Sequence, residues 1–134
     1  MKKWRRRVHL FLSIVELKTK AISVVTYGTA VVYVLYTQGA LPPLLFVLMT
    51  AAVLFVDMGT TAFNNYFDFR SGVDVPEYSR DEDKVLMWED ISSFTALHIA
   101  VVLFFCAVLL GLIITVLVGI PVAVAGAASM AVGY

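Results

Sequence analysis

Two long stretches without charged residues constrain this chain more than any other feature of its sequence. All ten Lys and Arg and all ten Asp and Glu lie in residues 2–20 and 57–90, so residues 21–56 and 91–134 carry no formal charge. An uncharged apolar stretch of about 18 residues is long enough to cross a bilayer as a helix. The composition is 60% hydrophobic, which is more apolar surface than a soluble domain could bury. The sequence therefore predicts an all-α, polytopic transmembrane helical bundle.

Helix-breaking residues divide the two apolar stretches into about four spans. Pro42 and Pro43 cannot continue a helix, and Gly119 with Pro121 marks a second turn. The predicted spans cover residues 20–38, 44–67, 91–118 and 120–134, and a polar loop covers residues 68–90. The last span would reach only about 22 Å, against a hydrocarbon core of about 30 Å. We therefore expect the chain to be the N-terminal part of a longer protein.

The distribution of cations predicts the orientation in the membrane. Residues 1–19 include a short predicted helix over residues 8–17, which we expect among the lipid headgroups with Trp4 as an anchor. Cations occur in this N-terminal segment and in residues 70–84, whereas the short turns at 38–43 and 119–121 have none. By the positive-inside rule, the N-terminus and the 68–90 loop face the cytoplasm, with the chain in the cell (inner) membrane. The expected partner is the lipid bilayer, and no nucleic acid is expected to bind.

A polar stripe runs down one face of the second predicted span. At about 100° per residue, Asp57, Thr61, Asn64 and Asp68 fall within a narrow arc. The other faces carry large apolar and aromatic side chains, namely Leu54, Phe55, Met58, Phe63, Tyr66 and Phe67. Polar groups inside a bilayer are costly and usually face a bundle interior or a wet cavity. The stripe predicts a cavity that opens to the cytoplasm.

The oxygen-bearing residues at the end of this stripe suit a magnesium site. Asp74 lies six residues past Asp68, and a break at Gly72 would let the chain fold back so that these carboxylates converge with an amide. Carboxylate oxygens are typical Mg²⁺ ligands, with water and phosphate oxygens completing the shell. Mg²⁺ would allow acidic residues to hold a diphosphate, and nearby cations would contact its phosphates. The candidate metal ligands are Asn64, Asp68 and Asp74, and the candidate diphosphate contacts are Arg70, Arg80 and Lys84.

The segment NNYFDFRSGVD, residues 64–74, resembles the first aspartate-rich motif of the UbiA superfamily of intramembrane aromatic prenyltransferases. It is most similar to the NDYFDxxxGxD form of the 1,4-dihydroxy-2-naphthoate polyprenyltransferases of menaquinone synthesis, and residues 16–20 and 80–84 support the resemblance. The resemblance implies a nine-span fold, of which about four spans are present here. It assigns Asn64, Asp68 and Asp74 to Mg²⁺ and diphosphate, with Asn64 and Asp68 as catalytic residues. Asn65 departs from the motif, because the common form has Asp at this position.

The same resemblance implies transfer of a polyprenyl group from polyprenyl diphosphate to an aromatic acceptor, with Mg²⁺ as cofactor. Tyr66 and Phe67 would either stabilise an allylic cation or serve in packing. Family members carry a second aspartate-rich motif that has no counterpart in residues 1–134. We therefore expect this chain to be inactive alone.

Two other functions fit parts of the sequence. In a small four-span transporter, Asp57 would be a proton or ion site rather than a residue that hydrates the cavity mouth or bonds Thr61. Transport predicts polar residues on several spans, but the other spans offer mainly Ser, Thr and Tyr with His98 and Cys106. A non-catalytic membrane scaffold would use close helix packing at the glycines Gly111, Gly119, Gly126 and Gly133. A scaffold leaves the Asn64, Asp68 and Asp74 set unexplained.

Overall fold

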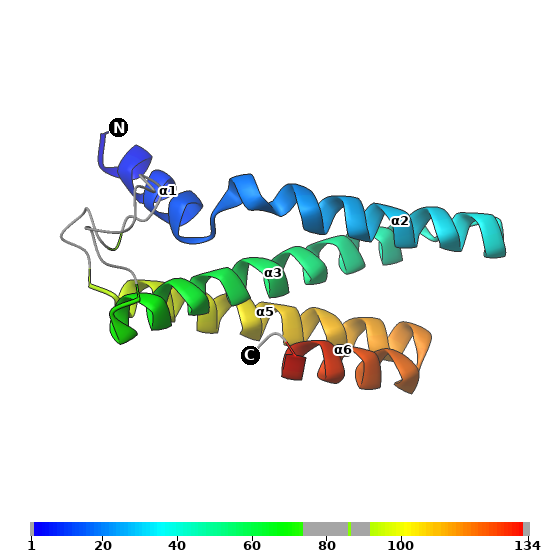
Figure 1. Ribbon diagram of the computed structural model, residues 1–134. Helices are drawn as coiled ribbons and strands as arrows, with labels where there is room; N and C mark the ends of the chain where they lie inside the picture. Colours follow the sequence, from blue (N-terminus) through cyan, green and yellow to red (C-terminus); the bar gives the residue numbers. More distant parts are fainter. Residues whose placement is uncertain (1, 74–85, 87–91, 133–134) are drawn as a thin grey trace.

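The computed structural model describes residues 2–73, 86 and 92–132, and the described residues form helices without any strand. The elements are α1 (Lys2–Ile14), the 3₁₀ helix η1 (Leu17–Lys20), α2 (Ala21–Gln38), α3 (Pro43–Ser71), α5 (Phe94–Val118) and α6 (Ile120–Val132). The long helices run lengthwise beside one another, and α6 folds back along α5 (Figure 1). The predicted all-α fold is confirmed.

Three of these helices, α2, α3 and α5, are long and apolar enough to cross a membrane. The apolar part of α6, Ile120–Ser129, is shorter than a full span. The turn between α2 and α3 and the turn between α5 and α6 lie at one end of the bundle, whereas α1 lies at the other end (Figure 1). The chain thus has the architecture of a multi-pass helical membrane protein, and its basic N-terminal helix lies at one end of the helix bundle.

Two helices extend further than the sequence pattern predicted. Helix α3 continues four residues beyond residue 67 and ends at Ser71, because Gly72 adopts a left-handed conformation with φ 74°. The Val73 N–H then donates to the Asp68 carbonyl at 3.1 Å, which is the bond of a Schellman cap. Asp68 and Arg70 therefore lie on the helix and not in the loop. Helix α1 begins at Lys2 instead of residue 8, since Lys and Arg are good helix formers.

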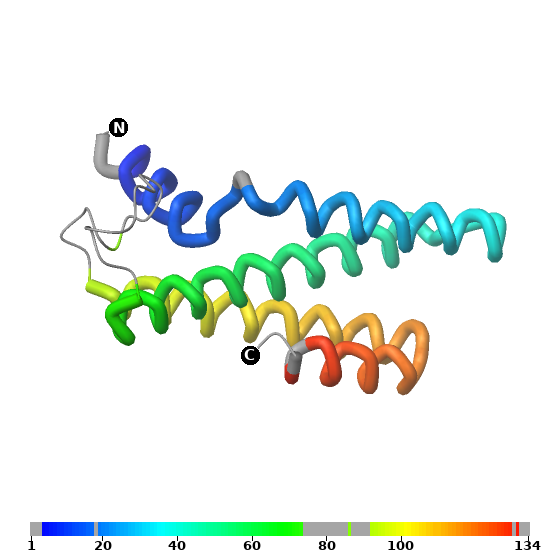
Figure 2. Tube along the Cα trace, viewed as in Figure 1, coloured from blue at the N-terminus to red at the C-terminus, as the bar shows by residue number. Residues whose placement is uncertain are grey.

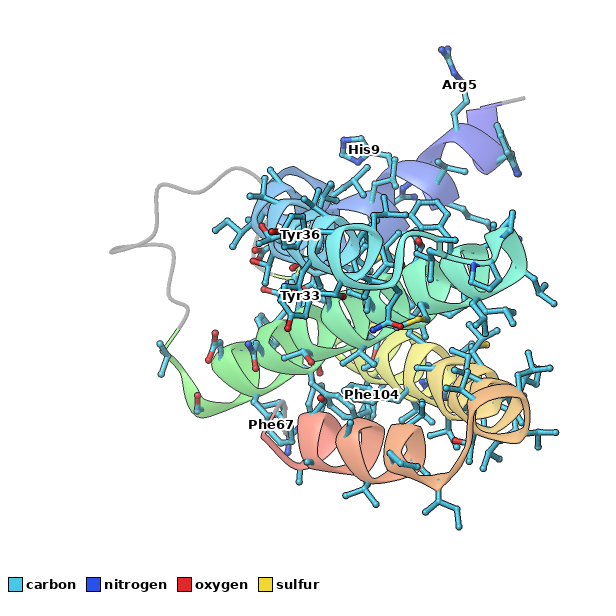
Figure 3. The ribbon with its side chains drawn as sticks, turned by 90° about the vertical axis from the view of Figure 1, so that its right-hand side faces the viewer. Arg5, His9, Tyr33, Tyr36, Phe67 and Phe104 are labelled. Atoms are coloured by element: carbon cyan, nitrogen blue, oxygen red, sulfur yellow. The ribbon has the colours of Figure 1, made fainter. Side chains whose placement is uncertain are left out.

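Helix α1 exposes its charged side and docks through its apolar end. Arg5 and His9 point away from the other helices (Figure 3). Ile14 is 1% exposed and belongs to a buried cluster at the junction of α1 with α3 and α5, and Figure 2 shows α1 joining the bundle at that end. The members of this cluster are Ile14, Ala62, Leu86, Ala96 and Ala100. The N-terminal helix is therefore packed against the bundle by its last turn.

Helix α2 contacts α3 along a narrow line. Gly39, with φ 73°, ends α2, and Pro43 begins α3, so the two helices form an antiparallel hairpin. Tyr27 stacks on Phe46 with ring centroids 6.3 Å apart, and its hydroxyl donates to the Phe46 carbonyl at 3.3 Å. Thr50 donates to the Tyr27 hydroxyl at 3.2 Å. No residue of α2 is buried, so this helix presents apolar side chains on most of its circumference.

Helices α3 and α5 pack more closely because small residues line their contact. The buried positions are Gly59, Ala62 and Asn65 on α3, and Ala96, Ala100, Leu103, Ala107 and Ile114 on α5. A Cβ atom at Gly59 would meet the ring of Phe104 at 2.8 and 2.9 Å. Nothing lies within 4 Å of a Cβ at Gly111 or Gly126 in the part of the chain described. The prediction of close helix packing at these two glycines is therefore wrong for the described residues. The close approach is at Gly59.

Gly59→Val is expected to destabilise the helix pair by about 1–3 kcal/mol, because the added side chain overlaps Phe104 and forces repacking. Gly28→Val is the matched control, since a Cβ at Gly28 meets nothing within 4 Å. Thermal unfolding in detergent micelles compares the two variants. Equal destabilisation by both would show that the α3–α5 contact at Gly59 is not the cause.

Candidate metal and diphosphate site

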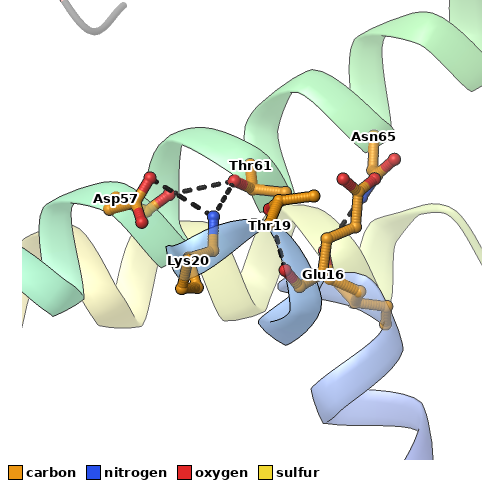
Figure 4. A network of polar contacts seen from close by, with 7 residues as sticks. Glu16, Thr19, Lys20, Asp57, Thr61 and Asn65 are labelled. Atoms are coloured by element: carbon orange, nitrogen blue, oxygen red, sulfur yellow. Dashed lines mark hydrogen bonds and ion pairs between the residues drawn. The ribbon is translucent and has the colours of Figure 1, made fainter. Parts of the chain in front are cut away.

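A lysine from the N-terminal segment contacts the first two residues of the predicted polar stripe, Asp57 and Thr61. Lys20 Nζ lies 3.2 Å from Asp57 Oδ1 and donates a 2.5 Å hydrogen bond to Thr61 Oγ1 (Figure 4). The Lys20 side chain is 6% exposed and that of Asp57 is 27% exposed. Asp57 is 14 residues into α3, about 21 Å along the helix, which places the pair inside the hydrocarbon region. An isolated charge is costly there, so each residue supplies the counter-charge that the other requires.

This ion pair changes the interpretation of Asp57. Thr61 Oγ1 donates at 3.1 Å to the backbone carbonyl of Asp57, so the expected contact between the two residues exists but does not involve the carboxylate. The carboxylate uses Oδ1 to pair with Lys20, while Oδ2 is buried without a hydrogen-bond partner in the part of the chain described. A carboxylate neutralised by a fixed lysine differs from the unpaired acid expected at a transport site.

The last two residues of the stripe, Asn64 and Asp68, carry side-chain oxygen atoms that could bind a ligand. Asn64 is exposed and Asp68 half-buried, and they lie one turn apart on α3. Neither side chain hydrogen-bonds another residue within the described ranges. Helix α3 is about 43 Å long, whereas the hydrocarbon core is about 30 Å thick, so this end projects into the headgroup layer. The two side chains are thus accessible to a ligand at the membrane surface.

The donor types at this end of α3 fit a hard divalent cation. Mg²⁺ commonly takes one or two protein carboxylates and fills its remaining positions with water and substrate oxygens. Asn64 and Asp68 supply an amide oxygen and a carboxylate on one helix face. Over residues 2–73, 86 and 92–132, no three His, Cys, Asp or Glu side chains gather at one point. Asp68 and Asn64 could therefore hold Mg²⁺ only together with ligands from elsewhere, such as a substrate.

Of the four remaining predicted site residues, Arg70 is the one that the structure describes. Arg70 is exposed in the last turn of α3, two residues past Asp68. Asp74, Arg80 and Lys84 lie outside the described residues. Gly72 turns the chain directly after α3, as the expected break requires. The proposed roles of these three residues stay predictions.

The aromatic residues of the motif take part in packing. Tyr66 lies edge-on to Phe67, with ring centroids 5.1 Å apart, and contacts Phe94 of α5 at 6.1 Å. Phe63 links this group to Phe104, at 5.3 Å between ring centroids. Tyr66 also packs against the buried cluster at the base of α1. Of the two roles considered for these rings, the contacts support packing.

Two residues of this region were missed by the sequence pattern, Lys20 and Asn65. Lys20 and Thr61 are each about 20 residues from the turn at 39–42, so an antiparallel hairpin brings them to the same level. That register was a usable signal. Asn65 is 9% exposed and donates from Nδ2 to the Ile14 carbonyl at 2.9 Å, a contact that no spacing in the sequence predicts.

Comparison with protein-family sequence profiles matches residues 23–134 to the UbiA prenyltransferase family. No curated protein and no solved structure gives a significant match. The family match includes all but the first two residues of α2 and the whole of α3, α5 and α6, so it includes the polar stripe from Asp57 to Asp68. It agrees with the superfamily that the 64–74 segment resembles. With its helical membrane fold and the match over most of its length, the chain belongs to the UbiA prenyltransferase family.

Proposed function

We propose that this chain forms the diphosphate-binding part of a Mg²⁺-dependent prenyltransferase that transfers a polyprenyl group to 1,4-dihydroxy-2-naphthoate in menaquinone synthesis. Family membership supports prenyl transfer to an aromatic acceptor in general. The choice of acceptor comes from the similarity of residues 64–74 to the motif form of the naphthoate enzymes. The observation that carries the proposal is the pairing of Asn64 and Asp68 on one face of α3, where the helix leaves the hydrocarbon core.

This position suits a substrate that is half lipid and half anion. A polyprenyl tail is soluble only in the hydrocarbon region, whereas its diphosphate belongs in the headgroup layer. Asn64 and Asp68 lie at the boundary between the two, beyond about 20 residues of α3 that span the 30 Å core. A diphosphate held there leaves its prenyl chain within reach of the apolar faces of α3 and α5.

Each residue then has a distinct task. The Asp68 carboxylate supplies the negative charge that binds the cation, and the Asn64 amide oxygen adds a neutral ligand on the same face. Arg70, two residues after Asp68, would donate hydrogen bonds to phosphate oxygens. The proposed site also includes Asp74 as a metal ligand and Arg80 and Lys84 as diphosphate contacts. Mg²⁺ held by Asn64 and Asp68 would neutralise charge on the diphosphate, which would make the diphosphate a better leaving group.

The reaction breaks the bond between prenyl C1 and the diphosphate oxygen, and the bonding electrons leave with the diphosphate. A carbon of the electron-rich acceptor ring forms the new bond to C1, and the ring regains aromaticity by losing the proton or carboxyl group at that carbon. The protein would be in the cell membrane, with α1 and the site at the cytoplasmic face, because the basic residues of α1 and Arg70 at the end of α3 lie at that end of the described structure.

The proposal predicts that membranes containing the natural protein convert labelled polyprenyl diphosphate and 1,4-dihydroxy-2-naphthoate into a prenylated product when Mg²⁺ is present. EDTA should abolish the product, and Mg²⁺ should restore it. With 4-hydroxybenzoate as the competing acceptor, we expect a kcat/KM at least about 100-fold lower. The reason is that an acceptor site shaped for the naphthoate would leave some of its buried polar groups without a hydrogen-bond partner when the smaller acceptor binds. Product formation with 4-hydroxybenzoate alone would refute the assigned acceptor, while equal turnover in EDTA would refute the role of Mg²⁺.

A further inference from the structure

We infer that Asn65 is a positioning residue of the proposed site. Its amide fastens residues 14–20, here called the junction segment, to α3 beside Asn64 and Asp68. The structural part of this inference stands alone, whereas its catalytic part depends on the proposed function.

The Asn65 amide satisfies a backbone group that the end of α1 leaves open. Ile14 is the last residue of α1, so its carbonyl has no partner within that helix. Asn65 Nδ2 donates to this carbonyl at 2.9 Å across 51 residues of sequence. The contact is buried, with Asn65 9%, Ile14 1% and Val15 0% exposed. Water cannot replace the hydrogen bond without opening this contact.

The other end of the junction segment is fixed to the same helix. Lys20 bonds Asp57 and Thr61, so α3 holds the segment at both of its ends (Figure 4). Between these ends Glu16 adopts a left-handed backbone conformation with φ 47°, which is strained for a residue with a side chain. Such a conformation persists where the surrounding contacts over-determine it. The junction segment is therefore held in one defined path along α3.

This contact requires an amide. Asn has two N–H donors in its side chain, whereas an ionised Asp has acceptors only. A carboxylate at position 65 would face the Ile14 carbonyl oxygen and repel it. The need for a donor at this position explains why Asn replaces the Asp of the common motif form.

The position of the junction segment gives this contact a consequence for the site. Asp57, Thr61, Asn64 and Asp68 share the polar stripe of α3, and Asn65 lies at its edge, about 60° around the helix from Asp68. The junction segment contacts Asp57, Thr61 and Asn65, and Asn65 directly follows Asn64 in the chain. Release of Ile14 would expose the buried residues beside Asn64 and loosen one side of the site.

The accessibility of Val15 tests the structural part. Val15→Cys is made with Cys106→Ala, because Cys106 is the chain's only cysteine. Val15 is 0% exposed, so in this double variant, which keeps Asn65, the thiol at position 15 should react slowly with a maleimide. Asn65→Asp should raise the labelling rate about tenfold or more, the ratio expected for loss of a buried hydrogen bond. Hydrogen exchange of amides 14–20 gives the same comparison without an introduced cysteine.

Asn64→Asp is the matched control for labelling, since it makes the same chemical change one residue earlier on the exposed side of the helix. It should leave the labelling and exchange rates within about twofold of the parent protein. Unchanged rates in Asn65→Asp, or an equal rise in Asn64→Asp, would overturn the inference. Neither result depends on whether the protein transfers prenyl groups.

Kinetics of the natural protein test the positioning role. In Asn65→Ala, kcat/KM for the prenyl diphosphate should fall about 10- to 100-fold through misplacement of the site. The Mg²⁺ concentration at half-maximal rate should stay within about twofold, because no ligand has been removed. A several-fold rise in that concentration would identify Asn65 as a ligand, and an unchanged kcat/KM would leave no role in positioning. If the parent protein shows no transfer, the proposed function fails while the labelling result still decides the contact.

Discussion

In the natural protein, Asp68→Ala is expected to lower Mg²⁺-dependent prenyl transfer by about 1,000-fold, the upper range for loss of one electrostatic group at a reacting centre. Asp68 is the only carboxylate among the described residues of the 64–74 motif, so its removal takes away the negative charge that we propose binds the cation. Asp68→Asn should lose nearly as much, because it keeps the shape and removes the charge. Product formation from labelled polyprenyl diphosphate at saturating Mg²⁺ measures both variants.

The stability of the Asp68 variants separates a site effect from a folding effect. The Asp68 side chain is half-buried without a hydrogen bond to another described residue, so its loss should change the free energy of unfolding by less than about 0.5 kcal/mol. Ser71→Ala, at the exposed end of the same helix, is the activity control and should retain turnover. Turnover close to that of the parent enzyme in Asp68→Ala would remove the central role proposed for this carboxylate.

Asp57→Ala is expected to lower the free energy of unfolding by about 3–5 kcal/mol, because it strands the buried ammonium group of Lys20. The Thr61 hydroxyl would remain as a hydrogen-bond partner of Lys20 but would supply no counter-charge. Denaturation in detergent micelles, followed by circular dichroism, measures the change. Stability equal to that of the parent protein would show that the ion pair does not form in the membrane environment.

The double variant Asp57→Ala with Lys20→Met provides a sharper test of the same pair. Replacing both partners of a buried ion pair by apolar groups is often nearly neutral, so most of the lost stability should return. Asp68→Ala is the matched control, since it removes a carboxylate from the same helix face without breaking an ion pair to any residue that the structure describes. Additive losses in the double variant would indicate that Lys20 and Asp57 act independently.

The end of α3 illustrates how far the sequence pattern could predict the site. The 100° periodicity placed Asn64 and Asp68 on one face, and Gly72 indicated where the helix could break. The pattern ended the helix at residue 67, because polar and charged residues begin there. The structure continues it to Ser71, since a helix ends where its carbonyls are capped, and here the cap is formed at Gly72. That extra turn is what fixes Asp68 relative to Asn64.

The contacts of Lys20 and Asn65 are harder to predict from the sequence than the face of a helix, because they join residues far apart in the chain. The sequence pattern placed Lys20 only at the start of the first predicted span, although the hairpin register could have paired it with Thr61. Asn65 looked like a lost carboxylate in the motif, whereas its amide fulfils a requirement set by a carbonyl 51 residues away. A long-range hydrogen bond leaves no periodic trace in the sequence.

The sequence by itself determined the membrane class, the approximate spans and the chemical types available at the candidate site, because hydrophobicity and helical periodicity are local properties of the chain. Only the tertiary structure decided which polar residues are committed to one another and which remain open to a ligand. Asp57 and Asn65 are committed to the junction segment, while the exposed Asn64 and the half-buried Asp68 have no hydrogen bond to another described side chain. The physical reason is that a buried polar group must find a partner, and its nearest partner is set by how the helices pack.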